Sequence, residues 1–408
     1  MSIIEPGTFE EGATLVMRRL RRATAAVLGG VGGISRPIDV SSRLGLDRSL
    51  AWKVWHVGHG ESDLPSPAHV PGQGGYQRFL QAAATAGTEG GLIAEASAAF
   101  AAFDRFTREH AGDRATADIM LGVLSDEGRK RHELARRREG FRAQTHFLGV
   151  QARMLYEADA LIPAPAGYAM TVARMRGYFG IVRTRPNVPW IISKSALAAP
   201  GKLLKVPKRE PLGDQSGNAG GDQEAGYNQA PGLTIIREFC SDPLPVVRRR
   251  MLDEYTIEDE LAPGPVGDFG AVDLVLGERI TMRAEEVTEV DAVTLPVFTP
   301  AERLCFDFFV HESLVEGAPT LKVNSTVHGD TPYIRGQDYD MIPVPETFSS
   351  LGAAGDVSAT PDVPRHREML EWFLARLGCP LSSLRAYRTR MSFPPMPSRV
   401  AAYYRLKA

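Results

Sequence analysis

The sequence predicts an α+β protein in which the helices come first and the strands come later. Up to residue 145, apolar residues recur at the three- to four-residue spacing of amphipathic helices. From His146 on, many segments alternate apolar and polar residues, which is typical of half-buried antiparallel strands. The 408 residues are too many for one hydrophobic core. We therefore predict an all-helical N-terminal domain, a helical middle segment, and a C-terminal, mainly antiparallel β-sheet region with one packed helix.

Residues 36–59 (RPIDVSSRLGLDRSLAWKVWHVGH) predict two short helices joined by a tight turn. Pro37 suits the first turn of a helix, where its missing N–H is harmless. Gly45 can end this helix in the left-handed conformation, and Asp47 can cap the next one. The residues that form an apolar face at helical spacing are Ile38, Val40, Leu44, Leu50, Ala51 and Val54.

This pattern resembles the helix-turn-helix of bacterial winged-helix transcription regulators, such as the MarR-like and IclR-like proteins. The resemblance extends over the first 60 residues if residues 9–28 form the leading helix. The residues that carry it are Val40, Ser41, Leu44, Gly45, Leu46, Ala51 and Val54. An ordinary helical hairpin that uses Gly45 as a C-cap is the alternative. A wing would need a strand pair after the second helix, but residues 58–75 are a Gly/Pro-rich loop, so any wing is missing, displaced or irregular.

The resemblance implies two groups of DNA contacts. The helix from Asp47 to about Val57 would be a recognition helix in the major groove. Its outward residues, which would meet the base edges, are Arg48, Ser49, Trp52, Lys53 and His56. The arginines that would hold phosphates are Arg18, Arg19, Arg22, Arg36 and Arg43. Residues 1–60 contain eight Lys and Arg against five Asp and Glu, a modest surplus that fits a small DNA-binding domain.

The rest of the chain divides where its pattern changes. After the helix-turn-helix domain (1–62) we expect a helical connector (75–145), a β-rich segment (146–200), a flexible Gly-rich loop (201–232) and an α+β sensor or dimerisation domain (233–408). Within the last domain, residues 363–377 predict a helix that Gly378 ends. The final strands, RAYRTRMSF and RVAAYYRL, predict a hairpin across PPMPS.

The sequence gives little sign of an enzyme. It contains no G-x-S-x-G, P-loop or H-E-x-x-H motif, and we predict no catalytic residue, no metal site and no cofactor. His56 and His59 have a metal-compatible spacing, but no complete ligand set lies near them in the sequence. Asp307 and His311 could form a buried pair, although a strand-end histidine near water is the reading that we favour for His311. Aromatic residues of the second half could line a small-molecule cavity or simply pack a core: Phe306, Phe308, Phe309, Tyr333, Tyr339, Trp372, Tyr387, Phe393 and Tyr403.

Composition favours a cytoplasmic protein. The formal net charge of −2 means that any nucleic-acid site must be a local basic face. The three cysteines are far apart, as expected of reduced thiols. The acidic start, MSIIEPGTFEEG, differs from a signal peptide, and no apolar run approaches the length of a membrane span.

Together these features predict a transcription regulator whose N-terminal helix-turn-helix binds double-stranded DNA. Its C-terminal region would dimerise the chain or sense a small-molecule effector, and we expect a homodimer with no membrane association. A structural protein that uses the helix-turn-helix to bind another protein is the main alternative. An enzyme with an unfamiliar α+β fold comes third.

Overall fold

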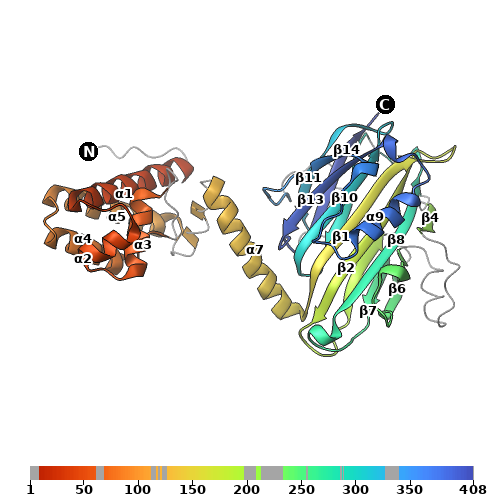
Figure 1. Cartoon of the computed structure of the whole chain (residues 1–408), viewed down its shortest axis with the longest axis horizontal. Helices are drawn as coiled ribbons and strands as arrows, with labels where there is room; N and C mark the ends of the chain where they lie inside the picture. The colour runs from red at the N-terminus through yellow and green to blue at the C-terminus, as the bar shows by residue number, and fades with distance from the viewer. Residues whose placement is uncertain are drawn as a thin grey trace. The chain divides into compact units, whose positions relative to one another are not determined.

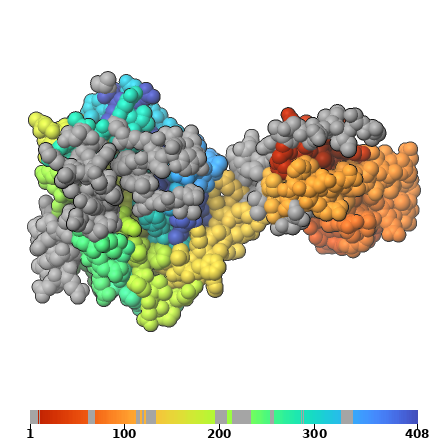
Figure 2. Space-filling model, turned by 180° about the vertical axis from the view of Figure 1, so that it is seen from behind, coloured from red at the N-terminus to blue at the C-terminus, as the bar shows by residue number. Residues whose placement is uncertain are grey.

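The chain folds into two compact units in a computed structural model, unit 1 (Met1–Ala135) and unit 2 (Arg136–Ala408). Figure 2 shows the atoms of each unit packed closely, unit 1 in red to orange and unit 2 in yellow to blue. The helices of unit 1 and the sheets of unit 2 confirm the predicted α+β class. The described residues are 9–60, 69–111, 116–117, 120–121, 126–196, 208–212, 233–253, 256–284, 287, 289–326 and 340–407.

Unit 1 is a set of helices around a single core (Figure 1). Tyr76 lies at its centre, where its ring stacks on Phe100 at 4.5 Å and its hydroxyl lies 2.7 Å from Oγ1 of Thr24. The helices with residue bounds are α1 (Phe9–Val31), α2 (Pro37–Leu44), α3 (Arg48–His59), α4 (Gln73–Thr85) and α5 (Gly90–His110). The predicted boundary at residue 62 is therefore wrong, because α4 and α5 complete the core that buries α1, α2 and α3.

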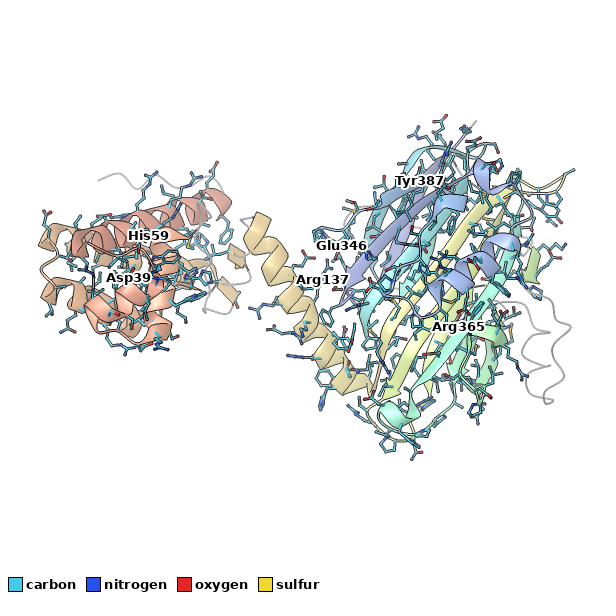
Figure 3. All side chains as sticks on the ribbon, in the orientation of Figure 1. Asp39, His59, Arg137, Glu346, Arg365 and Tyr387 are labelled. Atoms are coloured by element: carbon cyan, nitrogen blue, oxygen red, sulfur yellow. The ribbon has the colours of Figure 1, made fainter. Side chains whose placement is uncertain are left out.

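The unit boundary falls inside α7 (Asp126–Leu148), the last helix before the sheet. From Arg136 on, this helix packs on unit 2. Arg137 makes an ion pair of 2.8 Å with Glu346, and Figure 3 shows these two residues beside each other. The rings of Phe141 and Phe393 lie 5.3 Å apart. The segment predicted as one helical connector (75–145) is thus divided between two cores.

Unit 2 is built on an eight-stranded sheet. Its strands in spatial order are β12 (Ser349–Ala353), β13 (Leu384–Ser392), β10 (Ala301–His311), β1 (Val150–Pro163), β2 (Met170–Arg183), β8 (Val272–Met282) and β4 (Lys208–Pro211), with β5 (Thr234–Ile235) beside β8. The β1–β10 pair is parallel, and the other pairs are antiparallel.

Two three-stranded sheets cover one face of the large sheet, and a helix covers the other. The first small sheet has the order β11 (Val315–Ser325), β14 (Ser398–Leu406), β9 (Val290–Val297); the second has β3 (Trp190–Ala196), β7 (Thr256–Leu261), β6 (Val247–Asp253). The helix is α9 (His366–Ala375). Strand alternation sorts the side chains, so that Phe306 and Phe308 face the small sheets whereas Phe309 packs on Phe373 of α9.

Short 3₁₀ turns connect several strands. They are η3 (Arg237–Phe239), η4 (Asp268–Gly270), η6 (Ala354–Asp356) and η7 (Leu381–Ser383). The segment 233–239, which reads as one strand in the sequence, is instead the two-residue β5 followed by η3. Within the described residues, no helix is long and apolar enough to cross a membrane.

Two further predictions for unit 2 are corrected. The last two strands form no hairpin, because β13 pairs with β10 and β12 while β14 pairs with β11 and β9. The chain crosses from one sheet to the other between them, which buries an apolar face of each strand. Part of the predicted flexible loop (201–232) is strand β4; residues 201–207 and 213–232 lie outside the described part.

Candidate functional site

The predicted helix-turn-helix is present between α2 and α3. Pro37 begins α2, and Gly45 ends it with a φ of 62°, a left-handed conformation that favours glycine. A side-chain oxygen of Asp47 accepts a hydrogen bond of 2.9 Å from the backbone N–H of Leu50, which caps α3. Ser41 donates to the carbonyl of Leu46 at 2.7 Å and so ties α2 to the turn. These local contacts fix how α3 leaves the turn.

The outer face of α3 carries the predicted base-contacting residues. Leu50, Ala51, Val54 and Val57 are buried against the unit 1 core. Arg48, Ser49 and Trp52 are exposed, and Lys53 and His56 are half-buried at the edge of the same face. Trp52 leaves 42% of its surface exposed, which is unusual for a large aromatic residue. Ile38 of α2, predicted to join the apolar face, is instead 45% exposed.

Several aromatic rings contact one another on this outer face. The Trp52 and His56 rings lie 4.0 Å apart, and His69 meets Trp52 edge-on at 4.8 Å. Nδ1 of His56 lies 2.8 Å from the carbonyl of Trp52, and because a carbonyl only accepts, Nδ1 carries the proton. Trp55 stacks on His59 on the adjoining side. The contact of His69 with Trp52 could not be predicted from the sequence, because His69 lies outside α3 and reaches Trp52 through the tertiary fold.

The predicted phosphate contacts are not all on one surface. Arg19 makes a two-pronged ion pair with Glu95 of α5, at 2.9 and 3.2 Å, and so joins two helices; its assignment as a phosphate contact stays a prediction. Arg18 and Arg22 are exposed on the side of α1 opposite the buried Leu20. Arg21 of α1 donates to the carbonyl of Gly60, the residue that ends α3, at 3.1 Å.

Arg36 is the N-cap of α2, and Arg43 lies in the last turn of this helix. Arg36 pairs weakly with Asp39, at 3.6 Å. The carboxyl of Asp39 accepts hydrogen bonds from Ser35 and from the backbone of Arg36, and these hold the pKa of Asp39 below its usual value. Arg43 is exposed, and its guanidinium lies against the backbone of Gly33. Arg36 and Arg43 therefore lie at opposite ends of α2.

No wing follows α3 in the described part of unit 1. After the segment 61–68, which lies outside the described residues, the chain continues as α4 and α5, and no strand occurs among the residues of unit 1 that the structure describes. Any contact of the α3 surface with a partner would therefore rest on helices alone within this part of the chain.

A separate polar cluster lies beneath α9 in unit 2. Arg388 donates to both carboxylate oxygens of Asp307, with the Nη2 bond 3.0 Å long. Nδ1 of His366 accepts from the backbone N–H of Thr360, so the neutral ring carries its proton on Nε2 and donates to Asp307 at 3.0 Å. The hydroxyl of Tyr156 donates to the same carboxylate at 3.1 Å. His311, at the end of β10, does not pair with Asp307; its Nδ1 lies 2.7 Å from Oγ of Ser313 instead.

Electrostatics explain why Asp307 stays charged. Burial by itself raises the pKa of this carboxyl, but the hydrogen bonds from His366 and Arg388 outweigh it and leave the pKa below its usual value. Burial also raises the pKa of Tyr156 far above its usual value, so its hydroxyl stays a donor. All members of this cluster are buried, including Asp307 and Tyr156 at 0% exposure. The cluster therefore joins β1, β10, β13 and α9, and we assign it no catalytic role.

A second set of ion pairs lies on the opposite face of the large sheet. Glu157 stands directly across from Arg176 in the β1–β2 register, and Asp159 stands across from Arg174. The distances are 2.6 Å for Glu157–Arg176 and 2.8 Å for Asp159–Arg174. Glu278 on β8 receives Arg209 at 2.8 Å. Cross-strand pairing thus satisfies charges that strand alternation places between the sheets.

Unit 2 should lose stability as the pH rises because of Glu157. Burial, reinforced by the charge of Asp159, raises the pKa of Glu157 to about 7, although Arg176 and Arg174 oppose the rise. The folded state then binds a proton that the unfolded state releases near 4.5, so this contribution is complete at low pH and is lost between 4.5 and 7. Urea unfolding of the full chain across this range should give a steeper fall in stability for wild type than for Glu157→Gln. Equal slopes would contradict the assignment.

The aromatic residues that could line a cavity or pack a core lie in more than one core. Phe306 and Phe308 belong to one core and Phe309 to the other, Trp372 packs on Phe239, and Tyr333 and Tyr339 lie outside the described residues. Among the described residues no three His, Cys, Asp or Glu side chains gather as a metal ion would require.

No protein-family model matches this chain, and no curated protein matches it either.

Proposed function

We propose that unit 1 binds double-stranded DNA through α3 and that the chain is a transcription regulator. The supporting observation is the outer face of α3. A capped helix-turn-helix holds it toward solvent, it carries Arg48, Ser49 and Lys53, and no carboxylate occurs from Arg48 to Gly60. A helix of this kind fits the major groove, where arginine reads guanine and lysine holds phosphate. Unit 2 would supply dimerisation or effector binding.

Two substitutions test the proposal. Arg48→Ala should weaken binding to a duplex selected from a random-sequence pool by roughly 1–3 kcal/mol and relax the preference at one base pair. Lys53→Ala should weaken binding to all duplexes alike and lower the salt slope by about one. Gel-shift titration of the full chain at two salt concentrations measures both effects, with circular dichroism to confirm folding.

Arg105→Ala is the matched control. Arg105 is an exposed arginine of α5, which packs on α1 and α4, so its loss removes the same charge from unit 1 away from the turn. It should leave the affinity for DNA unchanged. A folded wild-type chain with no affinity for DNA at low salt would end the proposal.

Protein binding by the same surface is the second candidate, and the exposed Trp52 favours it. Exposed aromatic residues often anchor protein interfaces. In that case Arg48→Ala and Lys53→Ala should leave DNA unaffected, and Trp52→Ala should dissociate a protein complex.

A further inference from the structure

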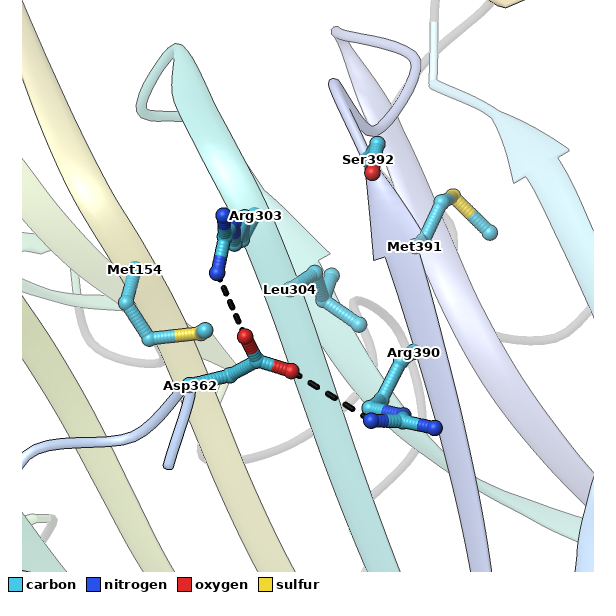
Figure 4. A pocket seen from close by; sticks show the side chains of 7 residues that line it. All are labelled: Met154, Arg303, Leu304, Asp362, Arg390, Met391 and Ser392. Atoms are coloured by element: carbon cyan, nitrogen blue, oxygen red, sulfur yellow. Dashed lines mark hydrogen bonds and ion pairs between the residues drawn. The ribbon is translucent and has the colours of Figure 1, made fainter. Parts of the chain in front are cut away.

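A hollow of about 300 Å³ opens on the α9 side of the large sheet, beside the buried Asp307 cluster. Met154 of β1, Arg303 of β10 and Arg390 of β13 contribute to its wall, together with Asp362 of the loop before α9. Figure 4 shows Arg303 and Arg390 pointing from neighbouring strands toward the carboxylate of Asp362. Ser392 stands at the rim.

The strand register explains why the two arginines converge. Arg303 pairs with Ser392 and Cys305 pairs with Arg390, so the arginines are diagonal neighbours on one face. The side chains of Arg303 and Arg390 are 58% and 61% exposed. Arg388, two residues before Arg390 on β13, is instead buried and paired with Asp307. Two guanidinium groups therefore remain within reach of a ligand from solvent.

Charge is unbalanced in this hollow. Two arginines face the single carboxylate of Asp362, which pairs with Arg303 and lies 3.4 Å from Arg390. That carboxylate also accepts a hydrogen bond of 3.3 Å from the hydroxyl of Thr360, so its own loop holds it in place. Each guanidinium has five N–H donors in a fork that suits two oxygens of an anion. One positive charge and several donors are left unmatched.

We propose that this hollow is a binding site for a small molecule with a phosphate group. A phosphate monoester carries close to two negative charges near neutral pH, which matches Arg303 and Arg390 better than the single charge of Asp362 does. Its oxygens would receive both guanidinium groups, and the hydroxyl of Ser392 adds a donor at the rim. Asp362 acts as an internal competitor that occupies the arginines until the ligand arrives.

Calorimetric titration of the full chain tests this assignment, with inorganic phosphate and phenyl phosphate as probes. Wild type should bind saturably, and Arg303→Gln and Arg390→Gln should each weaken binding by about tenfold or more, because each removes charge-assisted hydrogen bonds. Asp362→Asn should tighten binding, since it removes the competing charge. Tighter binding of the ester than of inorganic phosphate assigns an organic ligand, and equal binding assigns the free anion.

Arg385→Gln is the matched control, because Arg385 is a comparably exposed arginine of β13 that pairs with Glu312 outside the hollow. It should bind phosphate as wild type does. Three outcomes would overturn the proposal: no saturable binding by wild type and by Asp362→Asn, equal affinity of the Arg303 and Arg390 variants and wild type, or preference for succinate over both phosphates. Circular dichroism shows whether each variant is folded, and none of these outcomes depends on DNA binding.

Discussion

Replacing Arg388 with methionine is expected to destabilise unit 2 by roughly 3–5 kcal/mol, the usual cost of removing one partner of a buried ion pair. Arg388 donates two hydrogen bonds to Asp307 and a third, of 2.8 Å, to the carbonyl of Ser358. Its loss leaves a fully buried carboxylate with His366 and Tyr156 as its remaining side-chain donors among the described residues. Urea unfolding of the full chain, followed by hydrogen exchange of the β10 and β13 amides, measures the effect on unit 2.

The double variant Asp307→Asn with Arg388→Met is the control. It removes the buried charge together with its partner, so it should recover part of the lost stability. If Asp307→Asn lowered the stability of the Arg388→Met variant by as much as it lowers that of wild type, the two residues would contribute independently. The assignment of Asp307 and Arg388 as a coupled buried pair would then be wrong.

Tyr76→Ala is expected to destabilise unit 1 by roughly 3–5 kcal/mol, the cost of truncating a large buried aromatic side chain. Tyr76 is 1% exposed and joins three helices, through Phe100 of α5 and Thr24 of α1. Hydrogen exchange should show that amides of α1 and α3 lose protection together with those of α4, since these helices share one core.

Tyr76→Phe separates the ring from the hydroxyl. It keeps the stacking and removes only the bond to Thr24, whose hydroxyl still donates to the carbonyl of Leu20 at 2.8 Å, so the cost should be about 1 kcal/mol. If Tyr76→Ala left α1 to α3 fully protected, residues 1–62 would fold without α4 and α5, and the predicted boundary would be restored.

Local structure was largely predictable from the sequence because its causes are local. Pro37, Gly45 and Asp47 begin, end and cap helices through the backbone within a few residues of themselves. The same holds for the outward position of Arg48 and Trp52, since a helix has a fixed periodicity once its buried residues are known. Strand β13 was visible as alternation of buried and less buried positions, whereas β1, β2 and β10 are buried on both faces and appear in the sequence as longer apolar runs.

Partners distant in the chain were not predictable in this way. The sequence did not show that Arg19 pairs with Glu95 of α5, or that Asp307 bonds to His366 rather than to the nearer His311. The two last strands are adjacent in sequence but belong to different sheets, since β13 pairs with β10 and β12 whereas β14 pairs with β11 and β9.

The two candidate sites differ in the same way: the α3 face depends on local sequence, and the Arg303–Arg390 hollow depends on the tertiary structure. By itself the sequence determined the helix-turn-helix, the exposed basic face of α3 and the α+β class, since these depend on propensity, capping and periodicity. Only the tertiary structure decided that α4 and α5 complete the first core and that Arg303 and Arg390 converge on Asp362. Strand order and register set such convergence, and they follow from burial summed over the whole unit rather than from any one segment.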